Sequence, residues 1–175
     1  MTIKTVVLSS AHGKFVRGAK GCLDEVEESR KLMARIAQYL GQNGITVTTI
    51  NDDVSHTVGA NLRFLVNAHN SRKRDLDCSI HFNAHHKTTK PMGCEVLYRS
   101  DNALPLARKV SAAIANASGL KDRGPKHRTK LAVLNGTTAR WRIMLEVAFV
   151  DSEVDCKLYR THSDAIAKAV AEALI

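Results

Sequence analysis

The sequence predicts an α/β fold in a single domain: a twisted, mostly parallel sheet of about six strands flanked by helices on both faces. Short β-branched apolar runs alternate with longer stretches in which apolar residues recur at helical spacing, which is typical of strand–helix–strand units. The 175 residues, 44% of them hydrophobic and 25% charged, suit one globular domain with a sizeable core. No repeat, low-complexity tract or linker interrupts them, so we expect residues 1–175 to form one unit.

The strands are predicted from short apolar runs that are rich in β-branched residues and are bounded by turn residues or charged segments. In order along the chain, they span residues 4–9, 45–50, 76–82, 93–99, 131–134 and 141–150. In the third and the last of these runs, apolar residues alternate with a second set of side chains. Because successive side chains of a strand point to opposite faces, each of these two strands has two chemically different faces.

Four helices are predicted between or after these strands, at about residues 24–42, 57–75, 102–119 and 151–175. Their apolar residues recur every three or four positions. Asn43-Gly44 and Gly119 supply stops for the first and third helices, and Ser152 with Asp155 supplies an amino-terminal cap for the last one. The basic segment 121–130 is predicted to be a loop.

The net charge of +9, from 26 basic and 17 acidic residues, predicts an anionic partner such as nucleic acid, a membrane surface or a wall polymer. Aromatic residues make up only 5% of the chain, which leaves few rings to stack on bases, and no nucleic-acid motif of defined spacing occurs. We therefore expect no nucleic-acid partner. A basic nucleic-acid-binding domain or a metal-dependent nuclease stays open as the alternative interpretation.

The sequence carries no targeting or membrane signal that we recognise. No apolar run approaches the roughly 18–20 residues of a transmembrane helix, and the amino terminus lacks the apolar stretch of a signal peptide. We therefore expect cytoplasmic synthesis and no transmembrane segment. The four cysteines, Cys22, Cys78, Cys94 and Cys156, are widely spaced and include no Cys-x-x-Cys pair. This pattern argues against a disulfide framework or a thiolate zinc finger, and we interpret them as buried free thiols.

Titratable side chains gather at the predicted carboxyl ends of the strands. His81 and Glu146 lie late in two strands, each on the face opposite the large apolar residues. His12 follows the first strand, and Glu25 begins the first helix. Ligands of open α/β sheets bind beyond the carboxyl ends of the strands. The two histidines and Glu25 are thus a candidate zinc site with a fourth position open for water, and Glu146 is a candidate acid/base beside it.

Six segments occur in an order that resembles a known family. They are SSAHG, LDEVEESRKLMARIAQYL, DCSIHFNAH, GCEVLY, DRGPKHRTKLAVLN and IMLEVAFVDSEVD. The chain resembles the zinc-dependent N-acetylmuramoyl-L-alanine amidases of the amidase-3 type, in particular the catalytic domains of phage endolysins. The resemblance extends from about residue 4 to residue 174, and SIHFNA and LEVAFVDS are its most specific parts.

The resemblance implies one zinc ion per chain and a catalytic glutamate at Glu146. The implied zinc ligands are His12, Glu25 and His81. The family usually has glycine before its first histidine, where this chain has Ala11, so we expect a slightly different loop there. Glu28 lies one helical turn after Glu25, and it could assist Glu25 or replace it as the ligand.

The implied reaction is hydrolysis of the amide between N-acetylmuramic acid and the L-alanine of peptidoglycan, in which Glu146 passes a proton from water to the leaving amine. Arginine suits carboxylates, so the basic segment is a candidate to hold those of the stem peptide. The predicted substrate contacts are Asn83, Arg123, Lys126, Arg128 and Asn135. We interpret His85 and His86 as a solvated rim of the site.

The resemblance further implies a compact lytic enzyme of a phage or prophage. We expect a monomer whose residues 1–175 form one catalytic domain without a separate wall-binding domain. Its charge would help it find peptidoglycan and an anionic wall or outer-membrane surface. It would reach the wall after release across the membrane. An inactive wall-binding relative that keeps the fold alone is a third interpretation, which the four intact site positions disfavour.

Overall fold

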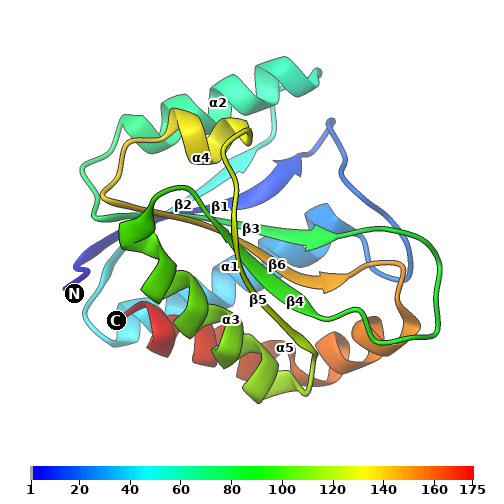
Figure 1. Ribbon diagram of the computed structural model, residues 1–175. Helices are drawn as coiled ribbons and strands as arrows, with labels where there is room; N and C mark the ends of the chain where they lie inside the picture. Colours follow the sequence, from blue (N-terminus) through cyan, green and yellow to red (C-terminus); the bar gives the residue numbers. More distant parts are fainter. Residues whose placement is uncertain (1) are drawn as a thin grey trace.

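The structure is a computed structural model that describes residues 2–175, and within this range six strands form one sheet (Figure 1). The strands are β1 (Thr5–Gly13), β2 (Thr46–Asp52), β3 (Leu76–Asn83), β4 (Cys94–Tyr98), β5 (Asp122–His127) and β6 (Trp141–Phe149). The helices are α1 (Glu25–Gln42), α2 (Val58–Asn70), α3 (Leu104–Ser118), α4 (Ala132–Gly136) and α5 (Glu153–Leu174), with a 3₁₀ turn at Asp101–Ala103.

The sheet has the strand order β2-β1-β3-β6-β4-β5 and is mostly parallel, as predicted. Strands β2, β1, β3 and β6 run in one direction, and β4 pairs with β6 in the opposite direction. β5 is parallel to β4. The carboxyl ends of the central strands therefore lie at the same edge of the sheet as the beginnings of β4 and β5.

Helices cover both faces of the sheet, which completes the predicted three layers. In Figure 1, α1, α3 and α5 lie below the sheet, and α2 and α4 lie above it. The larger core fills the space between the sheet and α1, α3 and α5, and it includes Leu76, Cys78 and Ile80 from alternate positions of β3. The smaller core on the other face includes Val7 and Met144. The predicted alternation of β3 and β6 is thus confirmed.

Two local predictions are wrong, and they lie next to each other in the chain. Residues 131–134 do not form a strand, because residues 132–136 form the short helix α4, whose Val133 and Leu134 pack into the smaller core. The sixth strand is instead β5, inside the basic segment predicted to be a loop. An edge strand tolerates charged residues and a proline such as Pro125, so β5 lacks the apolar signature of an inner strand.

The cysteine prediction is half right. Cys22 and Cys156 form a disulfide across 134 residues of sequence, which contradicts the expectation of a free thiol at either position. The bridge joins the loop before α1 to the first turn of α5, and spacing along the chain carries no signal for such a pair. Within the described range, Cys78 and Cys94 are buried free thiols, as predicted.

Candidate active site

His12 reaches the site through an unusual backbone conformation at the end of β1. Its φ of 55° lies in the left-handed region, which is strained for a residue other than glycine. The pairing of β1 with β2 shifts register between Ser9 and Gly13, so the chain bends away from the regular ladder at this point. The His12 Nε2 atom lies 3.1 Å from Glu25 Oε2. Such strain is characteristic of residues that are held for a function.

Glu25 is the first residue of α1 and is buried, with 3% of its surface exposed. The side chain of Asp24 caps this helix by accepting a hydrogen bond from the Glu27 backbone. Burial alone would raise the pKa of Glu25, but hydrogen bonds from His12 and His81 outweigh it and hold the pKa well below its usual value. Glu25 is therefore a buried, charged carboxylate between two imidazoles.

His81 lies near the end of β3 with both ring nitrogens in contact with polar atoms. Its Nδ1 is 3.1 Å from Glu25 Oε1, and its Nε2 is 3.0 Å from the Ser79 hydroxyl. Ser9 in turn donates a hydrogen bond of 3.1 Å to Ser79. Because both serines are buried, these contacts fix the orientation of the imidazole.

His12, Glu25 and His81 together have the donor atoms of a metal site. One ligand atom from each lies within 4.8 Å of the other two. Two imidazoles and one carboxylate are a donor set of catalytic zinc, which keeps its fourth position for water or substrate. Gly18 packs directly on the group, since a Cβ atom there would lie 2.2 Å from Glu25 Oε2. The residues present therefore fit a zinc ion. Glu28, the alternative ligand, instead pairs with Lys31 at 2.9 Å.

Glu146 faces the same region from β6, where it is paired with His81 across the β3–β6 ladder. Burial is the main cause that raises its pKa to about 8, and the negative charges of Glu25 and Glu95 add to the effect. Its Oε2 is buried and forms no hydrogen bond with any of residues 2–175. A buried acid without a partner and with a pKa near neutrality is typical of a group that transfers protons.

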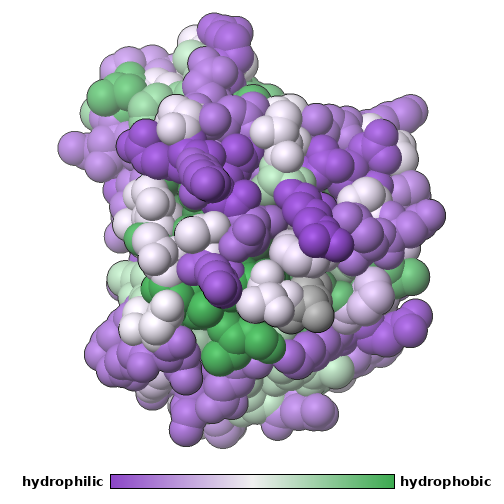
Figure 2. Space-filling view, turned by 90° about the vertical axis from the view of Figure 1, so that its left-hand side faces the viewer, coloured by the Kyte–Doolittle hydropathy of each residue, from purple (hydrophilic) through white to green (hydrophobic). Residues whose placement is uncertain are grey.

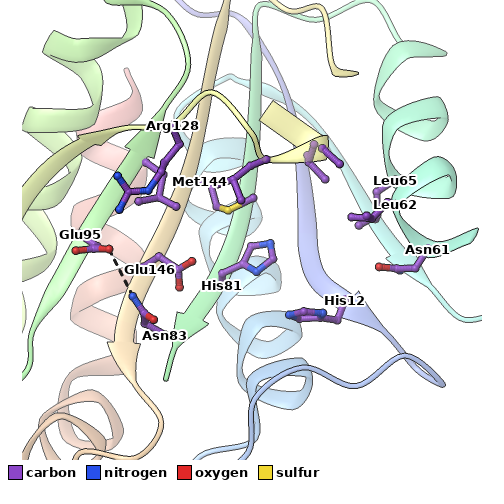
Figure 3. A pocket seen from close by; sticks show the side chains of 14 residues that line it. His12, Asn61, Leu62, Leu65, His81, Asn83, Glu95, Arg128, Met144 and Glu146 are labelled. Carbon is purple, nitrogen blue, oxygen red and sulfur yellow. Dashed lines mark hydrogen bonds between the residues drawn. The ribbon is translucent and has the colours of Figure 1, made fainter. Parts of the chain in front are cut away.

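These side chains open into a pocket of about 420 Å³ above the sheet. Figure 3 shows Glu95, Glu146 and Asn83 on one side of it, His81 and His12 on its floor, and α2 on the other side. The polar group thus lies at one end of the pocket. Apart from Asn61 and Arg128, the remaining wall is apolar and consists of Leu62, Leu65, Leu97, Leu131, Ala132, Val133 and Met144.

The structure places some of the predicted substrate contacts in the pocket lining and others outside it. Asn83 and Arg128 line the pocket. Within residues 2–175, the lining does not include Arg123, Lys126 or Asn135. The side chain of Asn135 instead accepts a hydrogen bond from Arg99 and donates one to the Thr129 backbone.

Arg123 instead contacts a residue of the pocket wall, since its Nε donates to Glu95 Oε2 at 2.8 Å. Sequence reasoning missed Glu95 as a site residue. Its signal was an acidic residue inside the apolar run GCEVLY, the same kind of signal that identified Glu146.

Comparisons with known proteins show the family and the fold of the chain. A model of the family described as N-acetylmuramoyl-L-alanine amidase matches residues 6–175. The chain superposes with a TM-score of 0.88 on the catalytic domain of the CD27L endolysin targeting Clostridia difficile, at 22% identity, covering 98% of this chain and 96% of that one. An N-acetylmuramoyl-L-alanine amidase from Clostridium difficile 630 gives a TM-score of 0.84 at 22% identity, with 97% and 94% covered. At such identities, these structures establish the shared fold.

A curated relative is longer than this chain. An uncharacterized 38.4 kDa protein of Clostridium perfringens is 29% identical over 173 residues, which cover 97% of this chain and 50% of the relative. The chain thus spans about half the length of the curated relatives it matches.

Proposed function

The chain belongs to the N-acetylmuramoyl-L-alanine amidase family, and from this premise we propose that it is a zinc-dependent hydrolase of peptidoglycan. The bond that it cuts joins the lactyl group of N-acetylmuramic acid to the L-alanine of the stem peptide. The observation that carries the proposal is the convergence of His12, Glu25 and His81 on one point, with the buried acid Glu146 in the same pocket.

His12, Glu25 and His81 would hold the metal. When bound there, zinc supplies a Lewis acid that polarises the amide carbonyl and lowers the pKa of water. Glu146 accepts a proton from the water that attacks the carbonyl carbon, and it returns this proton to the nitrogen as the C–N bond breaks. The products are a lactyl carboxylic acid and the free α-amine of L-alanine, so atoms and protons balance.

The surface and the rim of the pocket suit an anionic polymer. The net charge is +9, and Arg128 lines the pocket, where it can receive a carboxylate of the stem peptide. Among residues 2–175, no helix has both the length and the apolar character needed to span a membrane. We propose that the domain acts in a lysin of phage or prophage type.

The test compares two site variants with a surface control. Purified wild type, Glu146→Gln, His81→Ala and Glu172→Gln are assayed for zinc content and for release of amino-terminal alanine from purified peptidoglycan. Glu172 is an exposed glutamate of α5, so its variant makes the same chemical change away from the site.

We expect about one zinc per chain and alanine release in the wild type and in Glu172→Gln. Glu146→Gln should keep its zinc and lose about 10²-fold or more in turnover, the usual scale for a general acid/base. His81→Ala should lose the metal. New reducing sugar ends without new amino-terminal alanine, or full turnover in Glu146→Gln, would contradict the proposal.

A further inference from the structure

Glu95 is a second buried acid in the pocket, and the reaction described above gives it no role. It is 5% exposed, lies at the beginning of β4 and is paired with Glu146 across the β4–β6 ladder. It therefore presents its carboxylate beside the proton-transfer group, at the edge of the sheet where the metal ligands meet. A buried carboxylate is costly unless it is paired.

The pairing of Glu95 holds one of its oxygens firmly. Arg123 Nε donates to Oε2 at 2.8 Å, and the Arg123 guanidinium is itself braced by the Phe149 ring, 5.1 Å from its centroid. Arg123 Nη1 also donates to the Met92 carbonyl at 3.4 Å. The arginine therefore holds the Oε2 side of the Glu95 carboxylate in place.

The other oxygen has acceptor capacity left. Among residues 2–175, the hydrogen-bond contact of Glu95 Oε1 is with Asn83 Nδ2 at 3.5 Å, the outer limit for such a bond (Figure 3). Asn83 Oδ1 is used by the Ala84 backbone at 2.8 Å, which orients the amide group with its N–H donors toward Glu95. A carboxylate oxygen has two lone pairs, so Oε1 can accept a further N–H from a molecule in the pocket.

The substrate supplies such a donor. The amide to be cut has one N–H, and its nitrogen becomes an amine that gains a proton when the bond breaks. We propose that Glu95 contacts the substrate by accepting the N–H of this amide, and that it then holds the α-amine of the released L-alanyl peptide. This inference rests on the proposed function. Because the nitrogen gains positive charge as it leaves, the contact strengthens along the reaction and would accelerate it.

The experiment uses the zinc-loaded protein and two peptides as inhibitors of peptidoglycan hydrolysis. One is a synthetic stem dipeptide that begins with L-alanine and has a free α-amine, and the other is the same dipeptide with an N-acetyl group. The wild type should bind the free amine at least about 10-fold more tightly, as charge-assisted hydrogen bonds of this kind predict. Equal binding of the two peptides by the wild type would overturn the inference.

Variants assign the preference to Glu95. In Glu95→Gln, the ratio of the two inhibition constants should approach one and kcat/KM should fall about 10-fold, while the zinc content stays that of the wild type. The double variant Glu95→Gln/Arg123→Gln removes both charges together, so it serves as the test if the single variant, which leaves the half-buried Arg123 unpaired, fails to fold. Glu172→Gln is the matched control with an exposed glutamate.

The two proposals fail in different ways. If the variants keep the wild-type preference for the free amine, the inference about Glu95 is wrong and the amidase proposal stands. If the wild type releases no amino-terminal alanine from peptidoglycan, the proposed function is wrong and the inference falls with it.

Discussion

The two ends of β3 carry the same kinds of side chain and use them in opposite ways. At its beginning, Asp77 is buried between His69, 2.7 Å away, and Arg74, whose Nε and Nη2 donate at 2.8 and 2.9 Å. It also accepts from the Ala139 backbone at 3.1 Å. Both oxygens of this acid are therefore satisfied. Figure 2 shows this end of the molecule, whose surface is largely hydrophilic, with a large apolar patch low in the view and smaller apolar areas elsewhere.

At the far end, acids and imidazoles line a pocket. His81 shares a face with Asp77, but it contacts Glu25, which the His12 ring also contacts. Glu146 adds a buried oxygen that has no partner in the part of the chain that the structure describes. At the first end, the buried atoms without a partner among the same residues are His69 Nε2 and Arg142 Nε, which belong to basic side chains and not to the acid.

The difference shows that the same residue types can stabilise the fold at one end of a strand and be available for chemistry at the other. A buried acid whose acceptors are all used by donors of its own chain stabilises the fold. A buried acid with unused capacity that faces a pocket costs stability and is available to a ligand. The comparison can therefore be tested by changing an acid at each end.

The largest effect on stability is expected from Asp77→Ala. The substitution leaves Arg74 and His69 without their buried acceptor, and it should lower the free energy of unfolding by about 3–5 kcal/mol. Turnover per folded molecule should stay that of the wild type. Chemical denaturation measures the first quantity, and Asp101→Asn, at an exposed aspartate, is the control. A loss below about 1 kcal/mol would show that the network contributes little.

A smaller effect is expected from acid. Burial would raise the pKa of Asp77, but hydrogen bonds from His69 and Arg74 outweigh it and lower the pKa to about 2. Because the folded pKa lies below the unfolded one, Asp77 stabilises the protein above about pH 4, and this contribution of about 2 kcal/mol is lost as the pH falls toward 2. The difference in unfolding free energy between wild type and Asp77→Asn should shrink over that range. A constant difference from pH 6 to pH 2 would contradict the assignment.

The smallest effect, and one of opposite sign, is expected from Glu146→Met in the metal-free protein. Methionine has a similar shape and removes a buried polar group, so the free energy of unfolding should rise by about 1 kcal/mol while hydrolysis is lost. Denaturation in the presence of a chelator measures the change, with Glu146→Gln as the polar control. A destabilised methionine variant would place Glu146 with Asp77 among the structural acids.

The alternation of side chains along β3 and β6 is a property of each strand by itself. The period of two places His81 and Glu146 each on the face opposite the large apolar residues of its own strand. The alternation of strands and helices likewise determines the three-layer architecture. It also determines the edge of the sheet at which His12 and Glu25 meet His81 and Glu146. The resemblance of the motifs to the amidases implies the same four residues. The family model, which matches residues 6–175, agrees with the resemblance.

Tertiary structure alone decided which distant residues are neighbours. The disulfide of Cys22 with Cys156, the pairing of Arg123 with Glu95 and the exclusion of Asn135 from the pocket all depend on how finished elements pack. Edge strand β5 and short helix α4 were assigned wrongly for a related reason. The local pattern of a short segment is too weak to determine its structure. β5 is determined by its pairing with β4, and α4 by its packing into the smaller core. Local backbone geometry repeats every two or 3.6 residues, whereas contacts across a hundred residues have no period to be recognised in a sequence.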